Sequence, residues 1–365
     1  MIYTIFSLKD TTIYEKTELL NSGIDSILEL KHELVDPSAS LYNSRILMKF
    51  DLSELNEKIN SNKIPTSSNY FLSLRTVDVQ EVPQEYEIYA YPISSSWVNG
   101  TGQYNSQPIL TDGVSWKYRD SKTIGTTWEP TQSANPNVTG SFGKNVGGAT
   151  WWTYENLVCS QSFNYNSSDL YMNVTPLINE WLTGSINNDG MLVKFSDTIE
   201  KMPESFSKIQ FFSTDSNTIY VPRLHVCWDD STFSTGSLTA VNLDNINLNV
   251  KLKKYYSFNE NVKIKILANE KYPQKTYTTT AYSLKKYYLP ETSYYEIRDA
   301  HSDEIIIPFN NDATKISCNS DGNYFYLWMN SFQPERFYRI LIKVESDNGN
   351  ITQIYDNNYY FKVTR

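Results

Sequence analysis

The sequence predicts an all-β protein with two domains. Aromatic residues are abundant, with 28 Tyr, 16 Phe and 8 Trp, and such side chains fit the pleated, half-buried surface of strands. Short segments of alternating apolar and polar residues recur along the chain, separated by turns rich in Asn, Ser and Thr. At 365 residues the chain exceeds the usual length of one domain, and each half is long enough to bury its own core.

The clearest strand of the first half runs from Arg45 to Leu52. Its apolar residues Ile46, Met48 and Phe50 point to one face and the residues between them to the other, which is the period of a strand. The other strands expected in this half span residues 2–7 and 11–15, with a turn at Lys9-Asp10 between them, and residues 26–30, 70–77, 86–92, 191–195, 208–213 and 223–228.

Two segments of the first half have the pattern of a helix. Thr175 is a plausible N-cap, Pro176 suits the first helical position, and Gly184 can end the helix. The apolar residues Leu177, Ile178, Trp181 and Leu182 share one face of this helix. A second, shorter helix is expected at 53–59, capped by Ser53.

The polar stretch after Trp228 is the best candidate for a domain boundary, because the strand pattern breaks there and a glycine follows at Gly236. The expected division is a first domain at 1–229, a linker at 230–238 and a second domain at 239–365. The strands expected in the second domain are 248–254, 262–269, 294–298, 304–307, 315–317, 323–329, 338–345 and 358–364. Short strands at this spacing favour a second, immunoglobulin-like β-sandwich.

An ordered string of short motifs runs through the first domain. It comprises Asp10-Thr-Thr-Ile-Tyr14, Asn21-Ser-Gly23, Ser44-Arg-Ile-Leu-Met-Lys-Phe-Asp-Leu52, Ser96-Trp97, Val114-Ser-Trp116, Asn173-Val-Thr-Pro-Leu-Ile178, Trp181, Asn188-Asp-Gly190 and Pro222-Arg-Leu-His-Val226. This string resembles the DNRLRE-type β-jelly-roll domain. The sequence departs from the family pattern at Ser22, where the family has Tyr, and in a longer stretch at about 117–165.

The resemblance implies an N-terminal jelly-roll β-sandwich, and the whole chain looks most like virion structural proteins of tailed bacteriophages. The function it implies is that of a non-enzymatic structural component on the tail, neck or capsid exterior. The protein would be made in the bacterial host cytoplasm and act in the virion. Its expected partners are other virion proteins and copies of itself.

The tryptophans divide into two groups. Trp97, Trp116 and Trp181 match family positions that look like sandwich core, and Phe50 is expected to face the same core. Trp128, Trp151 and Trp152 lie in the long loop-rich stretch. Since aromatic residues are enriched at interface centres, these three are the interface candidates. Packing in the core is the other favoured alternative for them, and a sugar-stacking platform is less favoured.

No catalytic constellation stands out in the sequence. The three histidines, His32, His225 and His301, lie in no metalloprotease motif, and no Gly-x-Ser-x-Gly elbow supports a triad. The carboxylates that could serve glycoside hydrolysis are scattered: Asp10, Asp51, Asp112, Glu129 and Glu180. Asp51 is expected to fix a strand end, and Arg45 and Lys49 to share a structural ion-pair network with it. Asp229 and Asp230 lack the EF-hand pattern, so neither an enzyme activity nor a metal or cofactor is expected.

Charge and cysteine content limit the remaining classes. The net charge is −9 without a cluster of Lys and Arg, which argues against nucleic-acid binding. No apolar run is long enough to span a bilayer, and the N-terminal residues do not form a secretory signal. Cys159, Cys227 and Cys318 are far apart and are expected to be buried free thiols.

One alternative function and a third class stay open. Jelly rolls of this family also occur as carbohydrate-binding units, so the chain could be a carbohydrate-binding module or host-surface adhesin whose partner is a host-surface glycan. A glycan-cleaving tail enzyme would need a close carboxylate pair, and the sequence shows no spacing that selects one.

Overall fold

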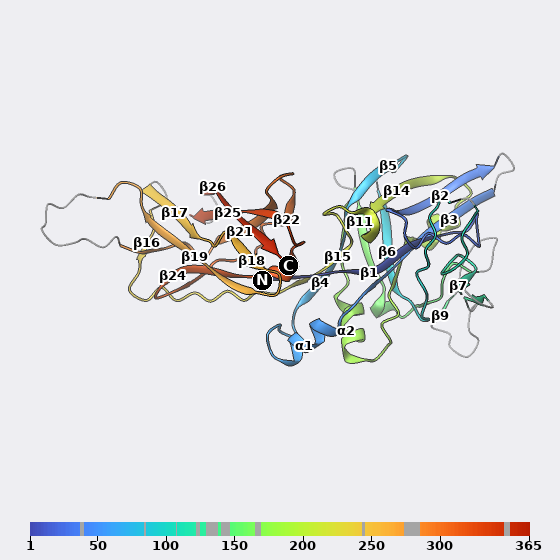
Figure 1. Ribbon diagram of the computed structural model, residues 1–365, viewed down its shortest axis with the longest axis horizontal. Helices are drawn as coiled ribbons and strands as arrows, with labels where there is room; N and C mark the ends of the chain where they lie inside the picture. The colour runs from blue at the N-terminus through green and yellow to red at the C-terminus, as the bar shows by residue number, and fades with distance from the viewer. Residues whose placement is uncertain are drawn as a thin grey trace, which may run out of the picture. The chain divides into compact units, whose positions relative to one another are not determined.

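The computed structural model describes residues 1–36, 40–83, 85–106, 108–121, 125–128, 138–139, 147–164, 169–242, 245–273, 285–346 and 351–365. These residues form two compact units (Figure 1). The N-terminal unit is Ile5–His225, and the C-terminal unit is Met1–Thr4 together with Val226–Arg365. Both units consist mainly of β-strands, which confirms the predicted all-β class. In the described residues, every helix is too short or too polar to cross a bilayer.

The N-terminal unit is a jelly roll. Its framework strands are β1 (Ile2–Tyr14), β3 (Ser40–Phe50), β4 (Asn69–Leu74), β6 (Tyr86–Pro92), β11 (Cys159–Phe163), β12 (Leu170–Asn173), β13 (Met191–Phe195) and β15 (Arg223–Cys227). One sheet has the order β1-β15-β4-β12 and the other the order β3-β13-β6-β11. The pairs are nested, because the first strand pairs with the last, β3 with β13, β4 with β12 and β6 with β11. This nesting is the topology of a jelly roll.

Strand β3 joins several parts of this unit. Its C-terminal half pairs with β1 and β13, and its N-terminal half pairs with β2 (Ile27–Asp36). Strand β14 (Phe206–Phe212) continues the layer by pairing with both β2 and β5 (Thr76–Gln80). The predicted alternation holds along β3, where Ile46, Met48 and Phe50 are fully buried.

Strand β1 is continuous, whereas the sequence predicts two strands with a turn at Lys9-Asp10. Its pairing with β3 shifts register between Ser7 and Lys9, and the intervening Leu8 is 60% exposed. A β-bulge therefore stands where the polar pair Lys9-Asp10 predicts a turn, because one extra residue interrupts the alternation without ending the strand.

Both predicted helices are present, but their N-termini are capped differently from the prediction. Helix α1 spans Ser53–Asn60, and the carboxylate of Asp51 accepts hydrogen bonds from the backbone N–H and the hydroxyl of Ser53. Helix α2 spans Thr175–Thr183, and the side chain of Asn173 accepts from the backbone N–H of Thr175. Gly184 ends α2 in the left-handed conformation, with φ of 76°.

The long stretch between β6 and β11 covers the outer face of the β3 sheet. Its described elements are β7 (Tyr118–Asp120), β8 (Thr126–Thr127), β9 (Val138–Thr139), β10 (Trp151–Trp152) and the short helix η1 (Glu155–Leu157). A second hydrophobic cluster, here called the outer core, forms beneath it. The outer core consists of Ile13, Leu47, Ile93, Trp97, Val114, Trp116, Trp128, Ala149, Trp151 and Leu192. Because Leu47 lies between Ile46 and Met48 on β3, the outer core occupies the face opposite to them.

The C-terminal unit is an immunoglobulin-like sandwich. One sheet contains β16 (Thr239–Ala240), β20 (Tyr287–Tyr288), β19 (Asn261–Glu270), β24 (Gly322–Trp328) and β23 (Ser317–Asn319), with β17 (Ile246–Lys251) on β19. The other has the order β18 (Tyr255–Ser257), β26 (Ile351–Thr364), β25 (Phe337–Ser346), β21 (Ser293–Asp299) and β22 (Ile305–Ile307). The rings of Tyr295 and Phe325, from different sheets, stack with centroids 4.2 Å apart. The order β17-β19-β24-β23 facing β26-β25-β21 matches that of an immunoglobulin constant-type domain.

The division between the units differs in two details from the expected boundaries. Residues Met1–Thr4 belong to the C-terminal unit, where the ring of Tyr3 meets the edge of Trp328. The expected linker at 230–238 is also part of this unit. Phe233 forms a parallel bridge with Cys318, and the backbone N–H of Ser234 donates to the Cys318 carbonyl at 3.0 Å. The polar composition of this segment therefore reflects an exposed sheet edge.

Candidate functional site

A cluster of buried charges lies on the outer face of the β3 sheet. Arg45 and Lys194 are fully buried there, and both bind the carboxylate of Glu200 from the short helix α3 (Asp197–Glu200). Arg45 Nε and Nη2 donate to Glu200 Oε1 and Oε2 at 2.8 and 2.6 Å, and Lys194 Nζ donates to Oε2 at 2.8 Å. The Arg45 guanidinium also lies 4.9 Å from the ring centroid of Trp116 and 5.1 Å from that of Trp151.

This charged cluster holds the fold together and is closed to substrates. Burial alone would raise the pKa of the Glu200 carboxyl, but the charges and hydrogen bonds of Arg45 and Lys194 lower the pKa below its usual value. The remaining Arg45 nitrogen donates to the carbonyl of Gly148 at 2.6 Å. The expected network of Arg45, Lys49 and Asp51 is therefore wrong for Arg45, since its partner is Glu200 and Asp51 caps α1.

The side chain of Asn21 connects several loops of the N-terminal unit by hydrogen bonds. Its Nδ2 donates to the carbonyls of Asn99 and Val114, both at 2.7 Å, and its Oδ1 accepts from the N–H groups of Gly23 and Gly102. A Cβ on Gly102 would lie 2.2 Å from the Asn21 carbonyl oxygen, so this close approach requires glycine. The Asn21 side chain thus joins three loop segments through hydrogen bonds to two backbone carbonyls and to the backbone N–H groups of two glycines.

The three histidines occupy unrelated places. His32 is buried, with Nδ1 2.7 Å from Asn43 Oδ1 and Nε2 3.0 Å from the Met202 carbonyl. Burial, with a smaller effect of Arg223, lowers the pKa of His225 to about 3, so its imidazole is neutral at pH 7. His301 is an exposed residue of the C-terminal unit. The three histidines therefore lie in different surroundings.

Two of the candidate carboxylates, Asp10 and Asp112, accept hydrogen bonds from threonine residues, and the bond given for Glu180 is made by its backbone. Asp10 accepts from the N–H and hydroxyl of Thr214, and Asp112 accepts from those of Thr101. Glu180 is half-buried in α2, and its carbonyl accepts from the N–H of Ser185 at 3.1 Å. Glu129 lies outside the described residues. Among the residues that the structure describes, no three His, Cys, Asp or Glu side chains gather as metal ligands.

The interface prediction is wrong for two of its three tryptophans. Trp128 and Trp151 are 2% and 1% exposed and belong to the outer core, so they have almost no surface left for a partner to cover. The Trp128 indole N–H donates to the carbonyl of Ser115 at 3.0 Å. Trp152 is half-buried and stacks on Tyr154, with centroids 5.8 Å apart. Trp152 alone therefore stays an interface candidate.

All four predicted core residues are buried, but they do not share one core. Trp97 and Trp116 are in the outer core, whereas Phe50 lies on the opposite face of β3. Trp181 is buried in α2 with Leu177 and Ile178. The three cysteines are buried free thiols, as predicted, and burial raises the pKa of Cys159 to about 11.

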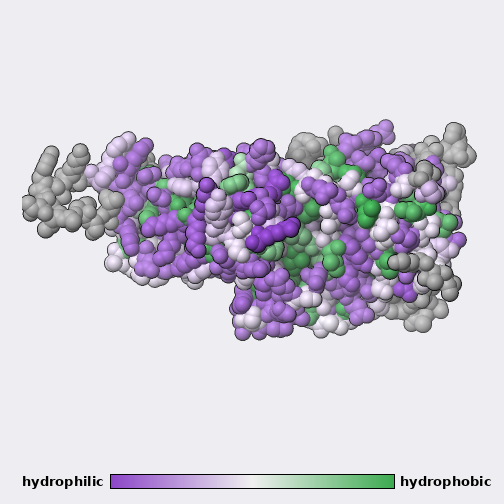
Figure 2. Space-filling model, viewed as in Figure 1, coloured by the Kyte–Doolittle hydropathy of each residue, from purple (hydrophilic) through white to green (hydrophobic). Residues whose placement is uncertain are grey.

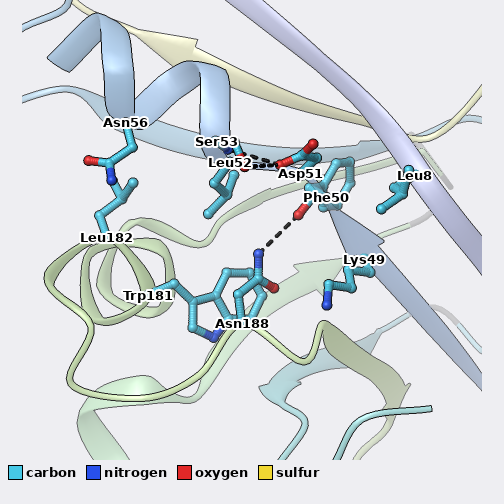
Figure 3. Close-up of a pocket in the computed structure, with 10 residues that line it drawn as sticks. All are labelled: Leu8, Lys49, Phe50, Asp51, Leu52, Ser53, Asn56, Trp181, Leu182 and Asn188. Atoms are coloured by element: carbon cyan, nitrogen blue, oxygen red, sulfur yellow. Dashed lines mark hydrogen bonds between the residues drawn. The ribbon is translucent and has the colours of Figure 1, made fainter. Parts of the chain in front are cut away.

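A cavity of about 470 Å³ lies beside the N-terminus of α1 and the C-terminal part of α2. Figure 3 shows Asp51, Asn56, Trp181, Asn188 and Lys49 around it, at the end of β3 where the chain enters α1. The Asn188 side chain donates to the Phe50 carbonyl at 2.9 Å. The volume of this cavity lies in the range of small-molecule binding sites. The sequence motifs predict these residues only as structural ones.

The outer face of the other sheet carries an exposed aromatic pair. Leu72 and Met172 are buried, so their neighbours Phe71 on β4 and Tyr171 on β12 point outward. The two rings stack with centroids 4.9 Å apart and planes at 7°, and Tyr171 is 41% exposed. On the surface drawn in Figure 2, which is hydrophilic over most of its area, apolar residues gather near the position of β4.

Comparison with known proteins adds little. No protein-family model matches the chain, and no curated protein matches it. Among solved structures, the chain shows a faint similarity to a DUF4785 family protein from Legionella pneumophila subsp. pneumophila str. Philadelphia 1, at 7% sequence identity and a TM-score of 0.17. That alignment covers 100% of this chain, which spans 62% of the Legionella protein. A similarity at this level carries no argument about fold or function.

Proposed function

We propose that this chain is a non-catalytic structural component of a tailed-phage virion, on the tail, neck or capsid exterior, and that it acts by docking to other virion proteins. The proposal rests on one observation: the residues of the sequence motifs have structural roles. Asn21 joins loops, Arg45 neutralises a buried glutamate, Asp51 caps a helix, and Trp97 and Trp116 fill a core. These residues maintain a rigid sandwich, which is what a docking module needs.

Two exposed aromatic pairs of the N-terminal unit are the surfaces proposed for docking. They are Phe71 with Tyr171 and Trp152 with Tyr154. Tyr and Trp supply a large contact area at a low cost in side-chain entropy, and exposed apolar patches commonly mark interaction sites. The occupant proposed for both is another virion protein.

The test is the incorporation of variants into particles. Phages lacking the native gene are complemented with Tyr171→Ser or Trp152→Ser, and the chain is quantified in purified particles. Loss of a docking anchor typically costs at least about 2 kcal/mol, so incorporation should fall more than tenfold. Tyr272→Ser is the matched control, because Tyr272 is 73% exposed on the other unit. Absence of the native chain from purified particles would refute the proposal. Unchanged incorporation of both variants would refute these docking surfaces.

A further inference from the structure

One sheet edge of the C-terminal unit has backbone groups that the described residues leave unused. Strand β25 pairs with one side of β26, whereas β18 covers the other side of β26 only at residues 362–364. In the part of the chain that the structure describes, no hydrogen bond reaches the outer side of residues 351–355, here called the β26 edge. An edge with unpaired N–H and C=O groups is a template for another strand.

The register of the sheet shows which backbone groups of the β26 edge point outward. Residues along an antiparallel strand form hydrogen bonds alternately with one neighbouring strand and with the other. The N–H of Glu345 on β25 donates to the carbonyl of Thr292, which lies directly before β21. Glu345 therefore does not bond to β26, and its pair partner Thr352 directs its N–H and C=O outward. By the same alternation, the backbone groups of Ile354 also point outward.

The side chains of the β26 edge lack the features that normally prevent edge pairing. Exposed edges are usually protected by charges, by proline or by being short. The β26 edge reads Ile351-Thr-Gln-Ile-Tyr355, without charge or proline, and its two isoleucines are 45% and 57% exposed. The opposite edge of the same sheet is protected, because β22 has three residues and follows Asp303 and Glu304. The β26 edge therefore has the composition of a strand that pairs on both sides.

We propose that the β26 edges of two copies of this chain pair antiparallel about a two-fold axis at Ile354, which joins two sheets into one. This register places Ile354 against Ile354 and Gln353 against Tyr355. No like charges meet, since the edge is neutral and the nearby Lys343 and Glu345 bind each other at 2.7 Å. A net charge of −9 makes two copies repel one another, so their contact requires a neutral surface such as this edge. This self-association uses the C-terminal unit and does not depend on the proposed docking function.

The test is the mass of the purified full chain in solution. Sedimentation velocity at rising concentration should show a shift from 42.2 kDa toward twice this mass. Ile354→Lys places two cations against each other, and Ile354→Pro removes an outward N–H that the fold does not use. Each variant should weaken dimerisation at least about tenfold. Ile305→Lys is the matched control and should dimerise like the native chain, because Ile305 is 45% exposed on the opposite edge of the same sheet.

A disulfide cross-link tests the register. The Cα atoms of a hydrogen-bonded antiparallel pair lie about 5.5 Å apart, which a disulfide can span. Ile354→Cys should therefore form a covalent dimer with oxidised glutathione, whereas Ile305→Cys should not. The three native cysteines are buried, so they do not compete.

Thermal unfolding verifies that all variants are folded. A chain that stays at 42.2 kDa at every soluble concentration would overturn the proposal. A dimer that survives both Ile354→Lys and Ile354→Pro, or failure of Ile354→Cys to cross-link, would also overturn it. So would a monomer whose β26 edge becomes protected only in virions, since another protein would then supply the strand. Particle incorporation is a separate measurement, so the mass in solution does not bear on the docking function.

Discussion

Arg45 and Glu200 form a bidentate ion pair that is inaccessible to solvent, with Nε–Oε1 and Nη2–Oε2 distances of 2.8 and 2.6 Å. The two residues are 155 positions apart, so the pair ties strand β3 to helix α3. Lys194 shares the same carboxylate and also binds Asp197 at 2.6 Å. Buried charges of this kind are tolerated only when every one of them is paired.

Replacing Glu200 should therefore destabilise the N-terminal unit strongly. Glu200→Gln removes the negative charge and leaves two buried cations, which typically costs about 3–5 kcal/mol of unfolding free energy. Urea unfolding monitored by circular dichroism measures the loss. Asp197→Asn is the control, since the Asp197 side chain is 46% exposed and its pair with Lys194 should contribute about 1 kcal/mol or less. A loss below about 1 kcal/mol for Glu200→Gln would show that the cluster is open to water.

Asp10 should make the stability fall as the pH rises. Burial raises its pKa from 3.8 to about 6, while hydrogen bonds from Thr214 oppose this effect. The pKa of Asp10 is higher in the folded state than in the unfolded state. Its contribution to the free energy of unfolding is therefore complete at pH values below the unfolded-state pKa, and it is lost as the pH rises through the folded-state pKa. Relative to Asp10→Asn, the native chain should lose up to about 3 kcal/mol between about pH 4 and pH 7. The measurement is urea unfolding of both chains across this range. A difference independent of pH would contradict the buried carboxylate.

Trp128 should contribute to the stability of the isolated monomer. It is buried in the outer core, so Trp128→Ala should cost about 3–5 kcal/mol of unfolding free energy. Trp152→Ala should cost clearly less, because Trp152 is only half-buried. Thermal unfolding of the two variants at equal concentration compares them. Equal melting temperatures for Trp128→Ala and the native chain would contradict the packing of Trp128 in the outer core and would favour its role at an interface.

Asn21 should be replaceable by neither Ala nor Asp. Asn21→Ala removes four side-chain hydrogen bonds at a site with no solvent access and should cost roughly 3 kcal/mol. Asn21→Asp keeps the shape but directs a carboxylate at the carbonyls of Asn99 and Val114, so it should be at least as damaging. Proteolysis of the loops near residues 99–102 would report the loss locally. If Asn21→Asp were as stable as the native chain, the hydrogen bonds of Asn21 would not be what holds these loops together.

Strand positions were predictable wherever one face of a strand is buried. The sequence alternation of Ile46, Met48 and Phe50 predicted β3, although Arg45 and Leu47 on its other face are buried as well. In the C-terminal unit β19, β21, β24 and β25 lie within a few residues of their expected ranges, whereas β26 begins at Ile351, well before the expected 358. Period-2 alternation depends on contrast between a dry and a wet face. This contrast is present in most strands of both units.

The outer core was not predictable from alternation, because the strands beneath it are buried on both faces. The signal that was present is the segment Met191–Phe195, in which all five residues are buried. A strand without polar alternation is covered on both sides. Recognising this would have indicated that the long stretch with Trp128 and Trp151 folds back on the sheet. The cavity was not predictable either, since its lining comes from β3, α1, α2 and the segment near Asn188.

The docking function is tested most directly by hydroxyl-radical footprinting of the chain, free in solution and within purified virions. Tyr171 is 41% exposed in the free chain, so its oxidation is readily detected by mass spectrometry. The proposed function predicts that Tyr171 and Trp152 become strongly protected in particles, while Tyr272 stays as reactive as in the free chain. Equal reactivity of Tyr171 and Trp152 in both states, or failure to find the chain in particles, would contradict it.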